Sequence, residues 1–335
     1  MKRICCVLMA VVVLLFAVGV NASAARPEDE TITIRAGHVN PPGEPAYEAW
    51  VMFKRLMEER LGDRVDVRLY PQAQLGGERD LIEQVRMGTL DMTAPAVSPL
   101  ALHNSELDVL NLPYLFESEE QLWEIVDGPI GERLAESTLE KAGIKILDWW
   151  STGVRHIFTP DRPLETPADM RGLTIRVMEN PIFMAAFEAL GASPQPLPYD
   201  QVYEALATGV VGAAENDSSG YRGMAFYEVA PYYSLTAHLI IGKPVLINPD
   251  FYNNLPDDVR EVLHEVLAEC TEFQRDGYAT AFEGDVEYLT GQAGVTVVQA
   301  EMEQFQRAML PVWDRFADEI GVELLQDVLT QLGIN

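Results

Sequence analysis

Two arginines in alternating segments are the side chains best suited to binding a small acid. In residues 174–178 (TIRVM) the alternation places Arg176 and Met178 on one face of an expected strand. A guanidinium group holds a carboxylate with two parallel hydrogen bonds, and a closed cleft of low dielectric strengthens them. Arg155, within 153–157 (GVRHI), has the same character. The alternative for both is an internal salt bridge with one of the many acids, and the pattern favours that alternative for Arg155.

Motifs of common enzymes are absent from the sequence. It contains no Gly-x-Ser-x-Gly elbow, no Gly-rich phosphate loop and no His-Glu-x-x-His. The histidines have no metal-ligand spacing, and a lone histidine is more often a structural hydrogen-bonding group. The sequence therefore predicts a protein that is not an enzyme and needs no metal or cofactor. A periplasmic enzyme acting on a sugar acid stays open, since two carboxylates in a cleft leave no linear motif. The five histidines are His38, His103, His156, His238 and His264.

The first residues are typical of a signal peptide. Met1-Lys2-Arg3 precedes an apolar run from Ile4 to Val20, and the small residues 21–25 (NASAA) follow it. We expect cleavage after Ala24 or Ala25, so residues 1–25 are removed and the protein works in the periplasm. Cys5 and Cys6 leave with this segment. Cys270 then remains alone, so the mature chain must be stabilised by an ordinary core rather than by a disulfide.

Charge and length restrict the partners and the architecture. The formal net charge of −28 over 335 residues argues against binding nucleic acid or an anionic membrane. After residue 25 no apolar run reaches the roughly 20 residues that span a bilayer. A chain of this length and apolar content is expected to form two lobes around large cores.

Periodicity predicts an α/β fold with a largely parallel sheet. The order is strand 31–36, helix 46–61, strand 65–69, helix 78–87 and strand 90–94. A second α/β region has strand 144–150, strand 173–177, a helix from 181 to 191, helix 199–207 and strand 210–214. A long helix from 256 to about 289 is expected to cross between lobes, and a last helix spans 302–320. We expect interleaved lobes, 26–152 plus 242–281 and 153–241 plus 282–335.

Several ordered motifs resemble one family, the solute-binding proteins of TRAP (tripartite ATP-independent periplasmic) transporters. The resemblance extends from about Ile32 to Leu332. It implies a two-lobed periplasmic binding protein fold, with a long interlobe helix and the ligand cleft between the lobes. It also implies TRAP membrane permease subunits as partners, and we expect a monomer. The motifs are 74–80 (QLGGERD), 112–116 (LPYLF), 153–156 (GVRH), 172–177 (GLTIRV) and 198–203 (PYDQVY).

The same resemblance assigns ligand-binding roles to individual residues. It implies that Arg176 binds the substrate carboxylate, that Arg155 assists, and that Tyr199 packs on the ligand. Asn216 matches the asparagine after the second-lobe strand. Residues at matching cleft positions are Glu78, His38 and Asn40, with His238 as a weaker match.

Two departures from the family pattern bear on the ligand. Residues 211–217 (VGAAEND) replace the common Val-Asp-Gly-Gln-Glu-Asn-Pro, which introduces Asp217. Ala96 and Pro99 stand where sialic acid binders carry a glutamate and an arginine, which argues against sialic acid.

A sugar acid needs one carboxylate clamp and several acceptors for hydroxyl groups, and Asp and Glu are suitable acceptors. Arg155 and Arg176 provide one clamp, and the two unpaired carboxylates would repel a second acid group. The expected hydroxyl partners are Glu78, Asn216, Asp217, Asn40 and His38. We therefore expect a small organic acid, with a hexuronate such as glucuronate or galacturonate favoured. Glu78 as a helix-start residue and Asp217 as a loop cap is the structural alternative. A C4-dicarboxylate, a 2-oxo acid with a metal near Glu215, another hydroxy acid and a sensor-coupled binding protein also remain open.

Overall fold

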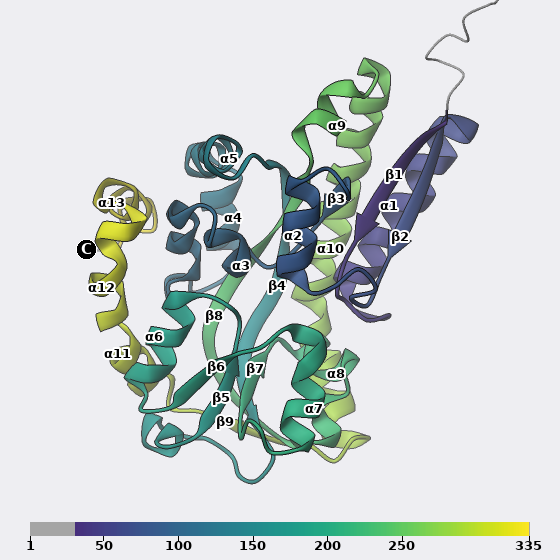
Figure 1. The fold of residues 1–335 in the computed structure, drawn as a ribbon. Coiled ribbons are helices and arrows are strands. Elements are labelled where there is room, and N and C mark those ends of the chain that lie inside the picture. The colour runs from purple at the N-terminus through teal and green to yellow at the C-terminus, as the bar shows by residue number, and fades with distance from the viewer. Residues whose placement is uncertain (1–30, 335) are drawn as a thin grey trace, which may run out of the picture.

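The computed structural model describes residues 31–334, which form a two-lobed α/β protein (Figure 1). The predicted signal peptide, its cleavage site after Ala24 or Ala25, and Cys5 and Cys6 lie outside the described residues. Within residues 31–334 no helix combines the length and apolar character that crossing a membrane requires. The lobe boundaries proposed from the sequence stay a prediction.

The first lobe is built on the βαβ unit that the sequence predicted. Strand β1 pairs in parallel with β2 on one side and with β3 on the other. Helix α1 covers this sheet with Trp50, Phe53 and Met57, all fully buried. The elements are β1 (Ile32–Gly37), α1 (Pro45–Leu61), η2 (Gly62–Arg64), β2 (Val65–Tyr70), α2 (Glu78–Arg86) and β3 (Met92–Thr93). They are followed by α3 (Val97–Ala101), η3 (Ser105–Asn111), α4 (Glu119–Val126) and α5 (Pro129–Ala142).

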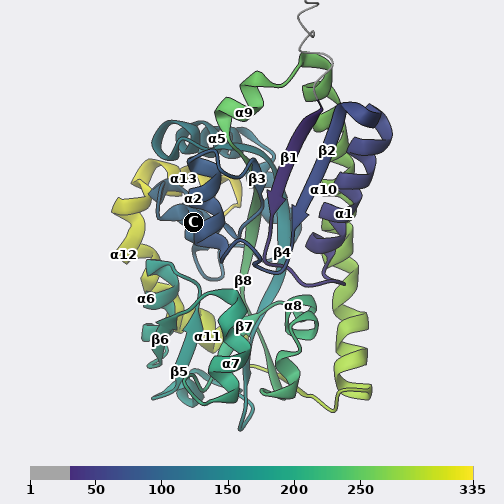
Figure 2. The same ribbon diagram turned by 45° about the vertical axis from the view of Figure 1, so that its right-hand side comes forward.

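Two long strands, β4 (Lys145–Thr159) and β8 (Tyr232–Ile247), pass from one lobe to the other (Figure 2). They pair with each other antiparallel over most of their length. At its ends β8 pairs with β3 and with β9 (Thr296–Gln299). The strand order is β2-β1-β3-β8-β4-β7. The sheet is therefore mixed, and the prediction of a largely parallel sheet was wrong because β4 and β8 run in opposite directions.

The second lobe is built around a short parallel pair of strands. Strands β5 and β6 pair in parallel, and Ile175 forms a bridge to Ala213. The strand predicted at 210–214 lies instead at β7, because the amides of Gly212 and Ala213 both donate to Thr174 O. The elements are η4 (Pro167–Met170), β5 (Thr174–Val177), α6 (Pro181–Ala189), β6 (Ser193–Pro196), η5 (Tyr199–Gln201) and α7 (Val202–Ala207). Next come β7 (Ala214–Asn216), α8 (Ser218–Gly223) and η6 (Phe226–Glu228).

Helix α10 (Asp257–Gly291) follows α9 (Pro249–Asn254) and runs beside both lobes (Figure 2). This confirms the long helix expected from the sequence. Cys270 is buried in its inner face, and burial raises the pKa of that thiol to about 12. The thiol is consequently unreactive at neutral pH.

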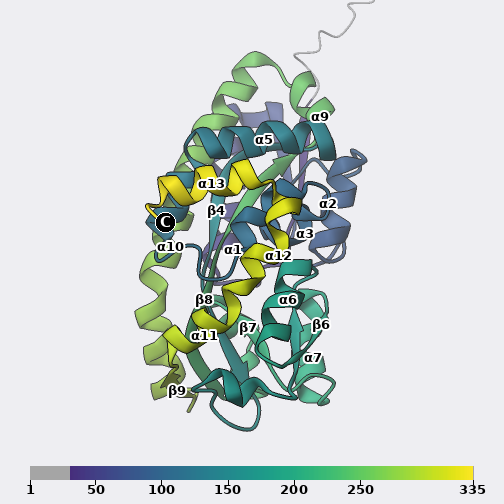
Figure 3. The same cartoon turned by 90° about the vertical axis from the view of Figure 1, so that its left-hand side faces the viewer.

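Two short helices replace the predicted final helix 302–320, and a third follows it. They are α11 (Met302–Met309), α12 (Pro311–Ile320) and α13 (Val322–Gln331). Pro311 cannot donate a backbone hydrogen bond, so a new helix begins there. Gly321 has a φ of 101°, which ends α12. Figure 3 shows these helices running along one side of the molecule, from α6 to α5.

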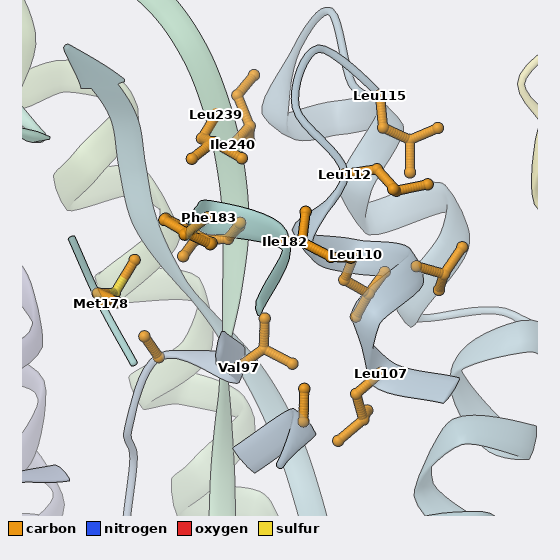
Figure 4. Packing of buried hydrophobic residues seen from close by; sticks show 14 of the residues in the cluster. Val97, Leu107, Leu110, Leu112, Leu115, Met178, Ile182, Phe183, Leu239 and Ile240 are labelled. Carbon is orange, nitrogen blue, oxygen red and sulfur yellow. The ribbon is translucent and has the colours of Figure 1, made fainter. Parts of the chain in front are cut away.

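A hydrophobic cluster joins the two lobes on the side away from α10 (Figure 4). Val97 and Leu110 of the first lobe belong to it together with Ile182 and Phe183 of α6. Each such side chain, fully buried, contributes about 1.5–3 kcal/mol to stability. The cluster thus stabilises the arrangement in which β5 and α2 approach each other.

Candidate ligand-binding site

A cavity with an accessible volume of about 40 Å³ lies between the lobes. Charged and polar side chains of both lobes dominate its wall. The lining residues are Val39, Asn40, Glu44, Glu78, Ala96, Thr152, Arg155, Arg176, Met178, Tyr199, Asn216, Asp217, Lys243 and Tyr278. Eight of the ten residues proposed from the sequence line this cavity: Asn40, Glu78, Arg155, Arg176, Met178, Tyr199, Asn216 and Asp217.

Arg176 reaches the cavity because β5 alternates as predicted, with Ile175 and Val177 in the core. Its side chain is 3% exposed, and Nε donates to Leu197 O at 2.9 Å. Among residues 31–334 no carboxylate forms an ion pair with it, and burial lowers its pKa. A buried charge without a partner is costly, and a carboxylate brought by a ligand would offset that cost. Arg176 is therefore an anion site with its counter-ion still to be supplied.

Arg155 lines the same cavity but already holds an internal carboxylate. Its Nε and Nη2 donate to the two carboxylate oxygens of Glu215, at 2.6 and 3.0 Å. Burial acts to raise the pKa of Glu215, but the charge of Arg155 and the nearby His238 lower it well below its usual value. This is the internal salt bridge left open by the sequence. The sequence suggested that both arginines clamp the ligand carboxylate. In the structure only the guanidinium of Arg176 lacks an ion-pair partner, and it lies beside the Arg155–Glu215 ion pair.

His238 and His38 do not line the cavity, which corrects their predicted contact with ligand. His238 is fully buried; its Nε2 lies 3.6 Å from Glu215 Oε2, so it supports the Arg155 pair from behind. His38 continues the pairing of β1 with β2, which turns its ring toward α1, where it stacks on Trp50. Burial lowers the pKa of His38 to about 3, so the ring is neutral.

Glu78 is held by two donors on the first-lobe side. Its Oε1 accepts from Ala96 N at 2.9 Å and lies 3.3 Å from Lys243 Nζ. Lys243 is 3% exposed and was missed by sequence reasoning, because it stands in the apolar run of β8. Glu78 is consequently a neutralised member of the wall rather than a repelling charge.

A hydrogen-bond chain crosses the cleft between the lobes. Tyr199 OH donates to Glu44 Oε1 at 3.0 Å and accepts from Asn216 Nδ2 at 3.0 Å. Asn40 Nδ2 donates to the other carboxylate oxygen of Glu44. Glu44 precedes α1 in the first lobe, whereas Tyr199 and Asn216 belong to the second. The chain therefore ties the two lobes in the closed arrangement, and Glu44 was not predicted from the sequence.

Asp217 caps α8 through its Oδ1, which accepts from Gly220 N at 2.9 Å. This confirms the loop-cap alternative; the same side chain lines the cavity, and its contact with ligand stays a prediction. Burial raises its pKa to about 6. The fit is tight: a Cβ on Gly153, which has a φ of 71°, would lie 3.0 Å from Asp217 Cβ and 2.9 Å from Tyr278 Cδ1.

Within residues 31–334 no group of three or more His, Cys, Asp or Glu side chains is placed to hold a metal ion. Glu215, where a metal was considered, is occupied by Arg155. The arrangement can enclose a small polar anion and bond its hydroxyl groups from several sides.

Residues 36–319 match the family described as bacterial extracellular solute-binding protein, family 7. The chain belongs to this family. The family 7 chain is 32% identical to the C4-dicarboxylate-binding periplasmic protein DctP of Rhodobacter capsulatus, over 98% of this chain and 97% of that protein. It is a TRAP solute-binding protein, and several of its relatives are periplasmic binding proteins.

Solved structures of family 7 proteins share the fold. A TRAP periplasmic solute-binding protein of Chromohalobacter salexigens with bound D-glucuronate superposes with a TM-score of 0.84 and 31% identity, covering 89% of this chain and 99% of that one. One from Sulfitobacter sp. NAS-14.1 with bound β-D-galacturonate gives a TM-score of 0.84 and 28% identity, covering 90% and 99%. Family membership confirms the fold class and the solute-binding role expected from the sequence.

Proposed function

We propose that this TRAP solute-binding protein captures a hexuronate in the periplasm, by closing over it, and delivers it to the TRAP permease. The observation that carries the proposal is Arg176, a buried guanidinium without an ion-pair partner among the described residues, in the wall of an interlobe cavity. One carboxylate on the ligand would satisfy it with two charge-assisted hydrogen bonds. The proposed role of Arg155 is to hold Glu215 and shape the wall beside this clamp.

The rest of the wall supports a ligand with several hydroxyl groups. Asn40, Glu44, Asn216 and Asp217 offer amide and carboxylate oxygens, which accept hydrogen bonds from hydroxyls. Asn40 Oδ1 is buried and has no partner among residues 31–334, so a hydroxyl donor would satisfy it. The two solved relatives that hold glucuronate and galacturonate support the same ligand class.

A C4-dicarboxylate is the second candidate, and Lys243 is the observation that favours it. Its ammonium group faces the cavity and would offer a second anion a donor if Glu78 gave way. The similarity to the Rhodobacter capsulatus protein points to the same class. The two candidates differ in what they need at the end of the cavity away from Arg176.

Capture by closure requires that the ligand bind the closed form more tightly than the open form. The Glu44–Tyr199 hydrogen bond links the lobes inside the cavity, and an ion pair of 3.4 Å between Arg79 and Glu179 links them at the rim. A ligand that bonds residues of both lobes adds to these links and shifts the population toward the closed form. The closed form is then the one presented to the permease.

A thermal-shift screen of the chain from Ala25 onward tests the proposal. The panel contains glucuronate, galacturonate, aldonates, C4-dicarboxylates and 2-oxo acids, with the neutral sugars glucose and galactose as controls that lack the carboxylate. Ligand at a thousand times its Kd adds about 4 kcal/mol, which raises the midpoint by several degrees. We expect the largest rise with hexuronates and none with neutral sugars. A rise confined to dicarboxylates or oxo acids would replace the hexuronate.

A further inference from the structure

Glu44 is a buried acid in an unusual place. It directly precedes α1, yet its side chain makes no cap hydrogen bond to that helix. It is 2% exposed and turns instead into the cavity, where Tyr199 and Asn40 donate to its two oxygens. No basic side chain of residues 31–334 forms an ion pair with it. A carboxyl group kept in a ligand cavity without a counter-ion needs a reason.

Asp217 is a second acid of the same kind. It is 5% exposed and lines the same cavity, and within the described part of the chain it too forms no ion pair. Glu78 and Glu215 differ, because Lys243 and Arg155 neutralise them. The cavity wall therefore contains two acids without counter-ions and one such cation, Arg176.

These groups lie at different ends of the cavity. Arg176, like Glu78 and Met178, is shared with a neighbouring hollow that is also lined by Arg79 and Pro99. Asp217 and Tyr278 are shared instead with a second hollow, lined by Phe282 of α10. Arg176 thus stands at the end toward Arg79, and Asp217 at the end beside α10.

Packing places Glu44 at the α10 end as well. A Cβ on Gly277 of α10 would lie 2.8 Å from Pro45 Cβ, and Pro45 directly follows Glu44. A Cβ on Gly153 would lie 2.9 Å from Tyr278 Cδ1 and 3.0 Å from Asp217 Cβ, so Asp217 stands beside Tyr278 of α10. Burial raises the pKa of Glu44 to about 8, and the charge of Asp217 adds to the rise.

We propose that Glu44 and Asp217 form an acidic end of the cavity that accepts ligand hydroxyls and excludes a second carboxylate. A ligand whose carboxylate sits on Arg176 then needs a hydroxyl, not an acid, at its far end. Above pH 8, where Asp217 and Glu44 are both ionised, a second ligand carboxylate would meet two like charges in a site of low dielectric, where they repel strongly. The inference rests on the proposed placement of the carboxylate at Arg176, but not on the ligand being a hexuronate.

The proposed acidic end is tested with matched pairs of acids that differ only in the group farthest from the carboxylate that Arg176 binds. Galactonate and galactarate have the same carbon chain and stereochemistry and differ in having a hydroxymethyl or a carboxylate at carbon 6. The pair 4-hydroxybutyrate and succinate makes the same exchange on a shorter chain. Isothermal titration at pH 8 gives the ratio of Kd values within each pair. We expect the hydroxyl member of at least one pair to bind, at least 100-fold tighter than its dicarboxylate.

The variants Glu44→Gln and Asp217→Asn, and the double variant, keep shape and remove charge. We expect the double variant to lower the ratio at least tenfold, through tighter binding of the dicarboxylate. Glu179→Gln, an acid-to-amide change at the rim beside Arg79, is the matched control and should leave the ratio unchanged. The proposal is overturned if the wild type binds the dicarboxylate as tightly as the matching hydroxy acid. It is also overturned if the ratio of Kd values is the same in the double variant as in the wild type.

A pH series on the wild type covers the case in which the double variant does not fold. The series uses galactonate and galactarate, because lowering the pH from 8.5 to 5.5 protonates carboxyl groups of raised pKa in the protein while both acid groups of galactarate stay ionised. The ratio should fall at least tenfold; a constant ratio contradicts the inference. The other charged or titratable groups facing Glu44 and Asp217 lie on six elements: Lys243 and Tyr233 of β8, Arg155 of β4, Tyr199 of η5, Glu119 of α4, and Tyr278 and Asp285 of α10, with Glu78 of α2 paired to Lys243. Absence of hexuronate binding with a preserved ratio for the short pair would reject the hexuronate alone.

Discussion

Replacement of Arg176 by alanine separates ligand binding from folding. In the unliganded protein this side chain makes one hydrogen bond, to Leu197 O, and no ion pair with a described carboxylate. Loss of that bond costs about 1 kcal/mol of stability. The substitution also removes a buried charge, and burying that charge opposes folding. The two effects oppose each other, so we expect the midpoint of the unliganded variant to stay within a few degrees of the wild type.

Ligand binding should respond very differently to the same change. Truncating one partner of a buried, hydrogen-bonded charge pair costs about 2–5 kcal/mol, because the other charge is left unpaired. At about 1.4 kcal/mol for each tenfold change, the Kd should rise about 30-fold to several thousand-fold. The assay is isothermal titration with the acid that gives the largest thermal shift, alongside unfolding curves of both unliganded proteins.

Arg171→Ala is the matched control for this experiment. Arg171 precedes β5 in the same lobe and is exposed, so its removal should change the Kd by less than about twofold. A Kd within threefold of the wild type in Arg176→Ala would refute the assignment of Arg176 as the carboxylate site. A large loss of stability in the unliganded variant would refute the argument that Arg176 awaits its counter-ion from the ligand.

Three further predictions concern the groups around this site. Glu215→Gln leaves Arg155 buried without a charge partner, so the free energy of unfolding in urea should fall by about 3–5 kcal/mol; a loss below 1 kcal/mol would contradict a structural role. Folding raises the pKa of Glu44 to about 8, so its protonated form contributes stability fully below about pH 4.3, and this contribution is lost as the pH rises through 8. The thermal midpoint should accordingly fall more between pH 5 and pH 9 in the wild type than in Glu44→Gln, and parallel curves would disprove this. Tyr199→Phe removes the interlobe hydrogen bonds to Glu44 and Asn216 while its ring contact with Phe226, at 5.8 Å, is kept. We expect about tenfold weaker ligand binding and a larger radius of gyration by small-angle scattering; an unchanged Kd would exclude a role in closure.

Local periodicity in the sequence was sufficient to predict a helix or strand where the segment packs against one neighbour. Helix α1, strands β1 and β2, β5 and the long helix α10 all lie close to the predicted ranges. It failed where pairing partners are far apart in sequence. The residues of β8 form a run interrupted by Gly242 and Pro244, which reads neither as clean alternation nor as a helix, so the mixed sheet was not foreseen.

The site was predicted in part for the same reason. Arg176 could be found because alternation fixes which face of β5 it occupies, and a family motif surrounds it. Glu44 lies among prolines and a glycine in residues 41–45, a composition typical of an exposed turn, and only the approach of Tyr199 from the other lobe buries it. Lys243 becomes a cavity residue only once β8 is placed beside Glu78. The partner of Arg155 likewise depended on the pairing of β4 with β7.

The pairing of β4 with β8 also bears on how fast this chain can fold. Residues 160–231 separate the two strands, and they include β5, η5 and α8, which carry Arg176, Tyr199 and Asp217. Contacts between segments so distant in sequence form slowly, because the entropy of closing the intervening loop is lost before the pairing is gained. We expect the central ladder to be the late step, leaving the chain without a ligand cavity until most of it has been synthesised. We expect a chain that folds this slowly to stay unfolded long enough to be exported across a membrane before its lobes come together.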